Sequence, residues 1–397
     1  MHKPESEDIK AKKKLKFPIL WIFLIVFFVL FILISLFPKT LGLGTYYQKD
    51  KSAIVNELVS EILKKEPVKP VLDKELYDKK MLELANNPIP KIVYETKEII
   101  TKDEKGNNVK TVQKIPLDPQ PVVQNIWPIK TPYPLAGAIL PFKRVIAYYG
   151  NLYSTKMGVL GEYPEEKMLS RLMAEAKKWE EADPHTPVLP ALHYIAVTAQ
   201  LNKGEDGKHR LRMPSKEIDK VLKMAEKINA IVFLDFQVGF STLEEELPVF
   251  KKYFELPNVH LGIDPEFSMK GDIRPGKVVG TFDAKDVNFA IDFLAKIVKE
   301  KELTPKILVV HRYTKKMLTN YQNIKPVPEV QVVMHMDGWG GKAKKINTYK
   351  SFIFPEPVQF TGFKIFYKND IWDAGTTLFT PSELLKLQPR PIYIQYQ

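Results

Sequence analysis

The chain has 397 residues, no cysteine and a formal net charge of +12 at pH 7. Without cysteine it can have neither a disulfide framework nor a lipidated cysteine anchor. Basic proteins often bind nucleic acid, but the lysines here are scattered and form no basic stripe interleaved with aromatic residues, so we expect a solvated basic surface instead.

An apolar segment near the N-terminus runs from Phe17 to Phe37 with no charge and one serine. As a helix rising 1.5 Å per residue, it is long enough for a hydrocarbon core of about 30 Å. It exceeds the roughly 7–15 apolar residues of a signal peptide, which favours an uncleaved anchor over a cleaved signal. By the positive-inside rule, residues 1–16 stay in the cytoplasm and the rest of the chain lies outside. The basic residues that set this orientation are Lys10, Lys12, Lys13, Lys14 and Lys16.

The segment between the anchor and the main domain changes character twice. Residues 38–90 are rich in lysine and glutamate, with apolar residues at helical spacing, and are predicted to form a juxtamembrane stalk. In residues 91–115, alternating side chains flank a polar turn and predict a β-hairpin. Residues 116–141 carry seven prolines, so we expect an extended lead-in packed against the main domain.

From residue 142 onward, short β-branched or aromatic runs alternate with helical stretches. This rhythm predicts βαβ units and a parallel sheet, and about eight units in roughly 250 residues fit a (β/α)8 TIM-type barrel. A doubly wound sheet is the alternative. The predicted strands are Arg144–Tyr149, Val188–Ile195, Ala230–Phe236, Val259–Ile263, Ile307–Val310, Val330–His335, Gln359–Phe366 and Pro391–Tyr396.

Four amphipathic helices are predicted between these strands, and Ser215 and Asp283 have the side chains expected of N-caps. No helix is predicted after the eighth strand, and we expect the proline-rich lead-in or residues 67–90 to cover it. The helices are Glu165–Glu181, Ser215–Ile228, Leu243–Phe254 and Ala284–Lys301.

Polar side chains recur at the ends of the predicted strands. Barrel enzymes carry their chemistry at the C-terminal ends of the strands and in the loops that follow. This recurrence favours one organised polar site over unrelated helix caps and core hydrogen bonds. The residues are Tyr148, Tyr149, Glu162, His193, Asp235, Gln237, Asp264, Glu266, His311, His335, Asp337, Trp339, Lys364 and Gln395.

The sharpest element is Asp264-Pro265-Glu266 after the fourth strand. Residues i and i+2 of a strand point to the same side, and two close carboxylates push their pKa values apart. Such a pair supplies a proton donor and a stabilising anion, as glycoside hydrolysis requires. We expect Glu266 to be the general acid, with Asp264, Asp235 and Asp337 orienting it or stabilising the positive sugar centre.

The remaining polar residues are predicted to contact substrate rather than to react. Aromatic rings near strand ends are expected to stack on sugar faces, and these are the rings of Tyr148, Tyr149, Trp339 and Tyr313. His193 is expected to form hydrogen bonds inside the barrel, and Lys364 is positioned to neutralise a carboxylate. The predicted substrate-binding residues are Tyr148, Tyr149, Glu162, Gln237, His311, His335, Trp339, Lys364 and Gln395.

A metal centre is the rival chemistry for the same residues. His311 and His335, on adjacent predicted strands, could hold a divalent ion together with Asp337 or Asp235. Metal-dependent amidohydrolase barrels also need a His-x-His pair on strand one and an aspartate on strand eight, which this sequence lacks. It also lacks a phosphate-binding glycine loop and a Gly-x-Ser-x-Gly elbow, so we expect no metal and no cofactor.

The stretch from Val145 to Gln397 resembles a largely uncharacterised bacterial family of membrane-anchored surface proteins and lipoproteins. The resemblance covers most of the predicted domain and implies a (β/α)8 barrel without a particular activity. Its pieces follow in order: Tyr149-Gly150 with Met157–Glu162, Leu234–Gln237, Gly262–Glu266, Gly280-Thr281 with Val287-Asn288, Val309–His311, His335–Gly338, Thr361–Lys364 and Tyr396-Gln397.

The barrel is also similar to polysaccharide-cleaving barrels of the chitinase and lysozyme type, which use an Asp-x-Glu at strand four. The longer Asp-rich signature of chitinases is absent, which argues against attack by an N-acetyl group. We therefore expect a surface-anchored, glycosidase-like barrel acting on cell-wall or extracellular polysaccharide. A glycan-binding or structural envelope protein without catalysis is the alternative, and a metal-dependent hydrolase is the third possibility.

Overall fold

The computed structural model describes residues 71–88, 94–116 and 126–397. Within the last range, eight parallel strands form a sheet that closes on itself because β13 pairs with β3. This closure confirms the predicted (β/α)8 barrel and excludes a doubly wound sheet. The strands are β3 (Arg144–Gly150), β4 (Val188–Ala199), β6 (Ile231–Phe236), β7 (Val259–Ile263), β9 (Lys306–Arg312), β11 (Val330–Met336), β12 (Phe360–Ile365) and β13 (Tyr393–Tyr396).

Three short strands lie outside this ring. After β4 the chain turns back, and β5 (Arg210–Arg212) pairs with it antiparallel. The two-residue strands β8 (Phe282–Asp283) and β10 (Leu318–Thr319) pair with each other.

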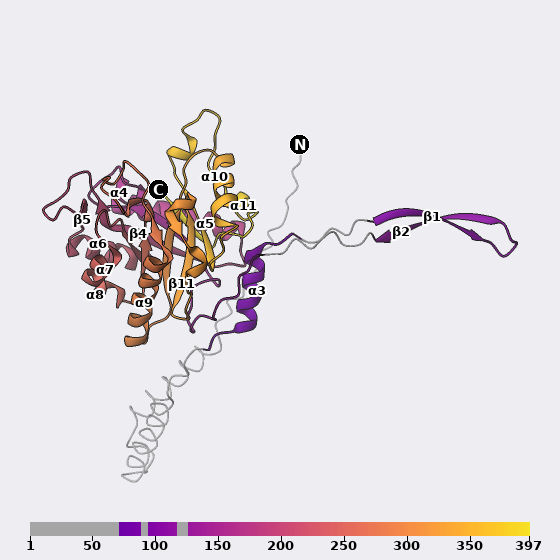
Figure 1. Ribbon diagram of the computed structural model, residues 1–397, viewed down its shortest axis with the longest axis horizontal. Coiled ribbons are helices and arrows are strands. Elements are labelled where there is room, and N and C mark those ends of the chain that lie inside the picture. The colour runs from indigo at the N-terminus through magenta and orange to yellow at the C-terminus, as the bar shows by residue number, and fades with distance from the viewer. Residues whose placement is uncertain (1–70, 89–93, 117–125) are drawn as a thin grey trace, which may run out of the picture. The chain divides into compact units, whose positions relative to one another are not determined.

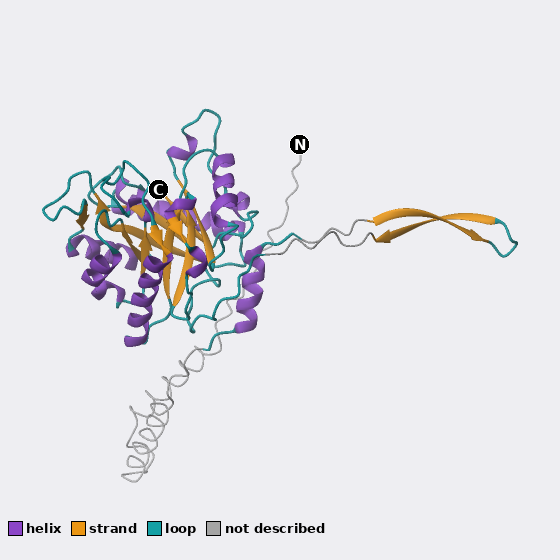
Figure 2. Cartoon of the chain, in the orientation of Figure 1, coloured by secondary structure: helices purple, strands orange, loops and turns teal. Residues whose placement is uncertain are grey.

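Helices surround the strands (Figures 1 and 2). Asp283 caps α9 as predicted, in a capping box with Asp286. Ser215 does not cap α6, because Pro214 occupies the cap position. The helices of the barrel are α4 (Val159–Glu162), α5 (Glu165–Ala182), α6 (Ser215–Glu226), α7 (Leu243–Glu246), α8 (Lys251–Phe254), α9 (Ala284–Glu300), α10 (Lys342–Thr348) and α11 (Pro381–Leu384).

The helix predicted over Leu243–Phe254 is broken into three pieces. A 3-10 helix, Leu247–Phe250, separates α7 from α8. Pro248 lies in its first turn, and a proline cannot donate the backbone hydrogen bond that a continuous α-helix needs there. The apolar periodicity predicts the helical character of this segment, and the proline changes its local geometry.

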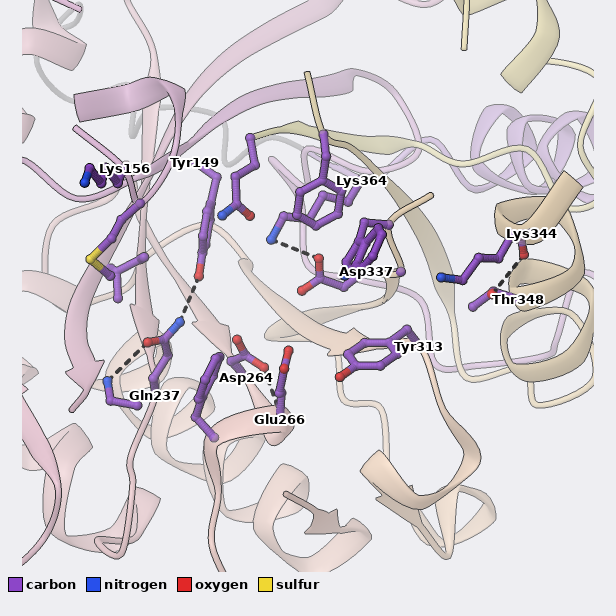
Figure 3. Close-up of a pocket in the computed structure, with 18 residues that line it drawn as sticks. Tyr149, Lys156, Gln237, Asp264, Glu266, Tyr313, Asp337, Lys344, Thr348 and Lys364 are labelled. Carbon is purple, nitrogen blue, oxygen red and sulfur yellow. Dashed lines mark hydrogen bonds and ion pairs between the residues drawn. The ribbon is translucent and has the colours of Figure 1, made fainter. Parts of the chain in front are cut away.

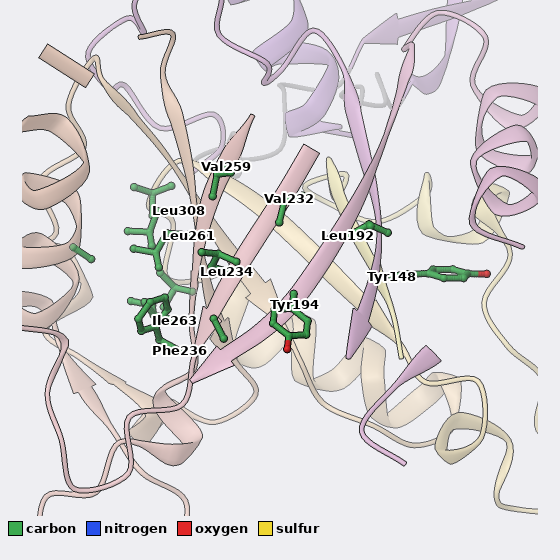
Figure 4. Close-up of a cluster of buried hydrophobic side chains, with 14 of the residues drawn as sticks. Tyr148, Leu192, Tyr194, Val232, Leu234, Phe236, Val259, Leu261, Ile263 and Leu308 are labelled. Atoms are coloured by element: carbon green, nitrogen blue, oxygen red, sulfur yellow. The ribbon is translucent and has the colours of Figure 1, made fainter. Parts of the chain in front are cut away.

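Alternation along the strands sorts the side chains between two cores. The outward-facing residues pack against the helices; in Figure 4 they include Leu192, Val232 and Leu261. The inward-facing residues, such as Val145 and Phe233, form a second cluster inside the barrel. Tyr148 belongs to the outer cluster, so its neighbour Tyr149 is the tyrosine that faces the barrel interior.

Helix α3 (Lys74–Ala85) belongs to the same compact unit as the barrel. It covers the end of the barrel at which the strands begin, which is called the lower end below. Asp73 caps the helix by accepting a hydrogen bond from the backbone N–H of Leu76. Tyr77 and Met81, four residues apart on one face, are buried in the inner cluster with residues from the beginnings of the strands. Thus part of the predicted stalk segment packs against the barrel instead of spacing it.

The outer face of the eighth strand has a different cover from the one predicted. The indole N–H of Trp179, from α5, donates to the Tyr396 hydroxyl at 2.9 Å, and the Tyr367 ring stacks on that of Tyr396. The first barrel helix therefore returns to cover the last strand, and no additional helix is required there.

The predicted hairpin is present as β1 (Tyr94–Lys102) and β2 (Asn108–Pro116). At its turn, the Asp103 carboxylate accepts from the backbone N–H groups of Lys105 and Asn107. No helix in the described part of the chain is both long and apolar enough to cross a bilayer. The predicted span at 17–37 lies outside the described residues.

Met81→Ala should lower the free energy of unfolding by about 2–5 kcal/mol, because it leaves a cavity where α3 meets the barrel. Leu82→Ala is the matched control: Leu82 is 62% exposed on the same helix, and its loss should cost less than about 0.5 kcal/mol. Denaturant titration measures both. Equal effects would show that α3 does not contribute to the stability of the barrel.

Candidate active site

A cavity of about 530 Å³ opens at the C-terminal ends of the barrel strands (Figure 3). Several residues predicted from the sequence line it together, although they come from five different strands or the loops after them. These residues are Tyr149, Gln237, Asp264, Glu266, Asp337, Trp339 and Lys364.

A chain of alternating charges lies at the floor of this cavity and beneath it. The two ring nitrogens of His311 face two carboxylates: Nδ1 is 2.7 Å from Oδ2 of Asp337, and Nε2 is 3.4 Å from Oδ1 of Asp235. On the other side, Nζ of Lys364 lies 2.9 Å from Oδ1 of Asp337. All four side chains are buried, and their formal charges sum to zero when each is ionised.

This arrangement fixes the charge of each member. Burial alone would lower the pKa of His311, but the negative charges of Asp235 and Asp337 raise it to about 10. Burial likewise opposes ionisation of Asp337, yet the charges of Lys364 and His311 hold its pKa well below the usual value. Burial also opposes ionisation of Asp235, but the charges and hydrogen bonds of His311 and His193 together outweigh it and lower the pKa of Asp235. At neutral pH the histidine is therefore an imidazolium between two carboxylates.

Gly262 makes room for this cluster. A Cβ at position 262 would overlap Oδ1 of Asp235 and Nε2 of His193. Any side chain at position 262 would push the Asp235 carboxylate away from the histidines. The strand therefore needs glycine here for close approach, and its backbone conformation needs no left-handed φ.

Asp264 ends the fourth strand and caps the short 3-10 helix Pro265–Phe267 that follows. Its Oδ1 accepts the backbone N–H of Glu266 at 3.0 Å. Burial raises the pKa of Asp264 well above its usual value, and the negative charges of Glu266 and Asp235 add to the shift. Both effects favour the protonated form of Asp264, which is able to donate a hydrogen bond.

Glu266 also has a raised pKa. Burial is the largest cause, and the negative charge of Asp337 adds to it. A hydrogen bond with the Tyr313 hydroxyl acts in the opposite direction. Figure 3 shows Tyr313 close to Glu266 on the cavity wall. The cavity therefore combines a carboxyl group that favours its proton with an ionised one, Asp337.

Tyr149 connects the cavity to the buried charges. Its hydroxyl donates to Oδ2 of Asp235 at 2.9 Å and accepts from the amide of Gln237 at 3.3 Å. The Oε1 atom of Gln237 in turn accepts the Ala199 backbone N–H, so the amide is fixed. The ammonium of Lys364 lies 3.9 Å from the centre of the Tyr149 ring, in a cation–π contact. Tyr149 thus helps to position Asp235, Gln237 and Lys364.

Other predicted site residues lie outside the cavity. The Tyr148 hydroxyl bonds that of Tyr367 on the outer face of the barrel, so Tyr148 does not line the site. Glu162 pairs with Lys368 at the surface, at 2.7 Å. His335 and Gln395 are buried below the cavity, where Gln395 donates to the Tyr393 hydroxyl. These placements follow from strand direction and loop course, which the spacing of the sequence does not specify.

His193 forms hydrogen bonds inside the barrel, as expected. Its Nδ1 lies 2.6 Å from the Tyr393 hydroxyl, and its Nε2 is 3.2 Å from Asp235. Burial lowers the pKa of His193 to about 4, so this ring is neutral while His311 is charged.

The loops and α10 contribute cavity residues that were not predicted, or that were predicted with only one of their contacts. Tyr313 was expected only to stack on sugars, yet it also bonds Glu266. Lys156, after the first strand, and Lys344, on α10, line the cavity as well. Among 59 lysines and arginines, these two had no distinguishing sequence signal.

The residues of the rival metal centre are only partly brought together. His311 belongs to two possible ligand groups, one with His193 and Asp235 and one with Asp264 and Asp337. His335 is in neither, and its ring nitrogens have no hydrogen-bond partner among the described residues. Since His311 and Lys364 already supply positive charge to Asp337, a divalent cation would have to displace both.

Comparison with known proteins gives similarity in structure only. Neither a family model nor a curated sequence matches the chain. The chain is similar to the cellulase Cel5C_n (TM-score 0.37, 10% identity, 64% of this chain and 75% of that chain). It is also similar to the Bacillus subtilis mannanase BCman (TM-score 0.35, 11% identity, 65% and 81%) and to Burkholderia cenocepacia dihydropteroate synthase (TM-score 0.30, 12% identity, 68% and 92%). Similarity at this level does not decide the chemistry of the site.

His311→Leu should cost about 3–5 kcal/mol of stability, because it leaves two buried carboxylates facing each other without the cation between them. His335→Leu is the control, since it removes an equally buried ring without a polar partner and should cost less than about 1.5 kcal/mol. Denaturant titration at pH 7 compares them, and equal losses would contradict the assigned charges.

The stability should also depend on pH through His311. Its folded-state pKa of about 10 exceeds the unfolded value of about 6.5, so its contribution is complete below pH 6.5 and is lost as the pH rises through 10. His311→Leu should lack this alkaline decrease. A decrease of the same size in both proteins would assign it to another group.

Proposed function

We propose that the barrel is a glycoside hydrolase acting on cell-wall or extracellular polysaccharide. We further propose that residues 17–37 anchor it in a membrane with the barrel on the outer face. The anchor is supported by the length of the apolar segment and the lysines before it. The hydrolase is supported by one observation above all: Glu266 and Asp337 line the same cavity with pKa values shifted in opposite directions.

In this mechanism Glu266 donates its proton to the oxygen of the glycosidic bond as that bond breaks. The sugar ring then carries positive charge, which the ionised Asp337 stabilises from the cavity floor. The leaving sugar departs with this proton on its oxygen. The oxygen of a water molecule then bonds to the positively charged sugar carbon, and the water gives its proton to the Glu266 carboxylate, which restores the acid.

The role of Asp337 is electrostatic rather than nucleophilic. Lys364 contacts its Oδ1 and His311 its Oδ2, so neither oxygen is free to bond to a sugar carbon without losing a charged partner. Lys364 was predicted to neutralise a carboxylate, and Asp337 is the carboxylate that it contacts. Trp339, 52% exposed at the cavity wall, supplies an aromatic face for a sugar ring.

The pairing of Asp337 also favours a second candidate function. If its negative charge is fully compensated, the cavity would bind a glycan without cleaving it. The same residues would then serve as a recognition site, and their substitution would change affinity instead of turnover.

Release of reducing ends from purified cell-wall glycans distinguishes these functions. Glu266→Gln should reduce release by about 10²–10⁴-fold, because the amide cannot donate the proton. Glu226→Gln, an exposed glutamate on α6, is the matched control and should retain activity. Activity should persist in EDTA, whereas its loss there would point to a metal at His311. Binding without release by the native chain would favour the recognition site.

Tyr313→Phe should move the alkaline limb of the kcat/KM profile to higher pH. The hydrogen bond from Tyr313 lowers the pKa of Glu266, so its removal raises that pKa and keeps the acid protonated further into the alkaline range. Tyr367→Phe, on the outer face of the barrel, is the control and should leave the limb in place. An unchanged limb in Tyr313→Phe would argue that another group supplies the proton.

A further inference from the structure

Three lysines line the cavity, and two of them lack an anionic partner. Lys364 is paired with Asp337 at the floor. Lys156 and Lys344 are exposed at the wall, and within the described ranges no carboxylate lies within 4.0 Å of either ammonium. Lys344 instead lies 4.4 Å from the centre of the Trp339 ring, which places a cation beside an aromatic face.

The carboxyl groups of the cavity do not compensate these two cations. Asp337 is already matched by Lys364 and His311. Asp264 is buried and receives only the backbone N–H of Glu266, and burial raises its pKa well above the usual value. Only Glu266 remains, and its pKa is raised as well. Among the described residues, Lys156 and Lys344 therefore face the cavity with no carboxylate in contact, so both ammonium groups are available to an anionic ligand.

The two lysines approach the site from different directions. Lys156 lies in the loop between β3 and α4, and Lys344 is on α10, after β11. In Figure 3 they lie on opposite sides of the group formed by Asp264, Glu266 and Asp337. A glycan bound across this group would pass one ammonium on each side of the bond that faces Glu266.

We propose that the cavity binds an acidic glycan, with an anionic substituent on the sugars on both sides of the reacting bond. This inference rests on the proposed glycan site and specifies its substrate class. Lys156 would contact the acidic group on one side and Lys344 that on the other, while the Trp339 ring stacks on the sugar beside Lys344. An ammonium recognises a carboxylate, phosphate or sulfate as a point charge, so the shared property of the ligand is its negative charge.

The test uses the full chain and ligand pairs that differ only in charge. The ligands are tetrasaccharides of polygalacturonate, alginate and hyaluronan, each compared with its carboxyl methyl ester, and a phosphate-bearing cell-wall oligosaccharide compared with its dephosphorylated form. Calorimetry at 150 mM salt limits non-specific attraction to a chain of net charge +12. Binding is measured in a Glu266→Gln background to prevent turnover, and cleavage in the chain with Glu266.

At least one acidic tetrasaccharide should bind more tightly than its uncharged counterpart. Replacing Lys156 and Lys344 together by glutamine should weaken its binding by roughly tenfold, as expected for two exposed charge pairs, and leave the uncharged ligand unaffected. The control replaces Lys216 and Lys223, two exposed lysines of α6, and should change affinity less than about twofold. Which acidic ligand responds separates carboxylate from phosphate recognition.

Equal affinity for the charged and uncharged ligands would overturn the inference while leaving the proposed hydrolase intact. An equal loss in the α6 control would also overturn it, because the attraction would then come from overall charge. Charge-dependent binding that requires Lys156 and Lys344, without cleavage, would support the acidic glycan and contradict the hydrolase. Absence of binding to every acidic ligand would overturn the inference.

Discussion

The ring of His311, held between Asp235 and Asp337, is the interaction on which the site depends. An isolated charge at this depth would be neutralised by a shift in its pKa, because desolvation costs several kcal/mol. Here two carboxylates, an imidazolium and the Lys364 ammonium compensate one another. The consequence reaches the cavity. Two cations hold the pKa of Asp337 low, whereas burial raises the pKa of Asp264, which has no cation in contact among the described residues.

The closed barrel makes this arrangement possible. Eight strands bring inward-facing side chains together from positions as distant in sequence as Tyr149 and Lys364. At the lower end, α3 and the inner apolar cluster exclude water. At the upper end, the loops leave a cavity. The polar residues thus lie between a dry core and an open mouth, where burial shifts pKa values and a ligand can still enter.

The fold was largely predictable because β-branched runs and helical periodicity are local signals. All eight strands were located, while Pro248 broke a helix that its apolar pattern had predicted as continuous. Tyr148 and Tyr149 were both predicted to bind substrate, but adjacent residues of a strand face opposite sides and only Tyr149 faces inward. That choice depends on the register of β3 against its neighbours, which places Tyr149 over Asp235.

The residues of the site were predictable from the sequence only where they directly follow a strand. Asp264 and Asp337 follow buried strands directly, so both were found. Lys156 and Lys344 depend on the course of loops, and nothing local distinguishes them from other surface lysines. Tyr77 and Met81 had helical spacing, but only the three-dimensional structure shows what their face packs against. The charges of Asp264 and Asp337 likewise depend on contacts between segments far apart in sequence.

The most direct test of the central charge arrangement is nitrogen NMR of the chain with 15N-labelled histidine, recorded at pH 8.5. Of its seven histidines, one should remain an imidazolium with both ring nitrogens protonated, and its resonances should disappear in His311→Leu. If every histidine is neutral at that pH, His311 does not bridge two ionised carboxylates. The assigned charges of Asp235 and Asp337, and with them the proposed acid–anion pair, would then be wrong.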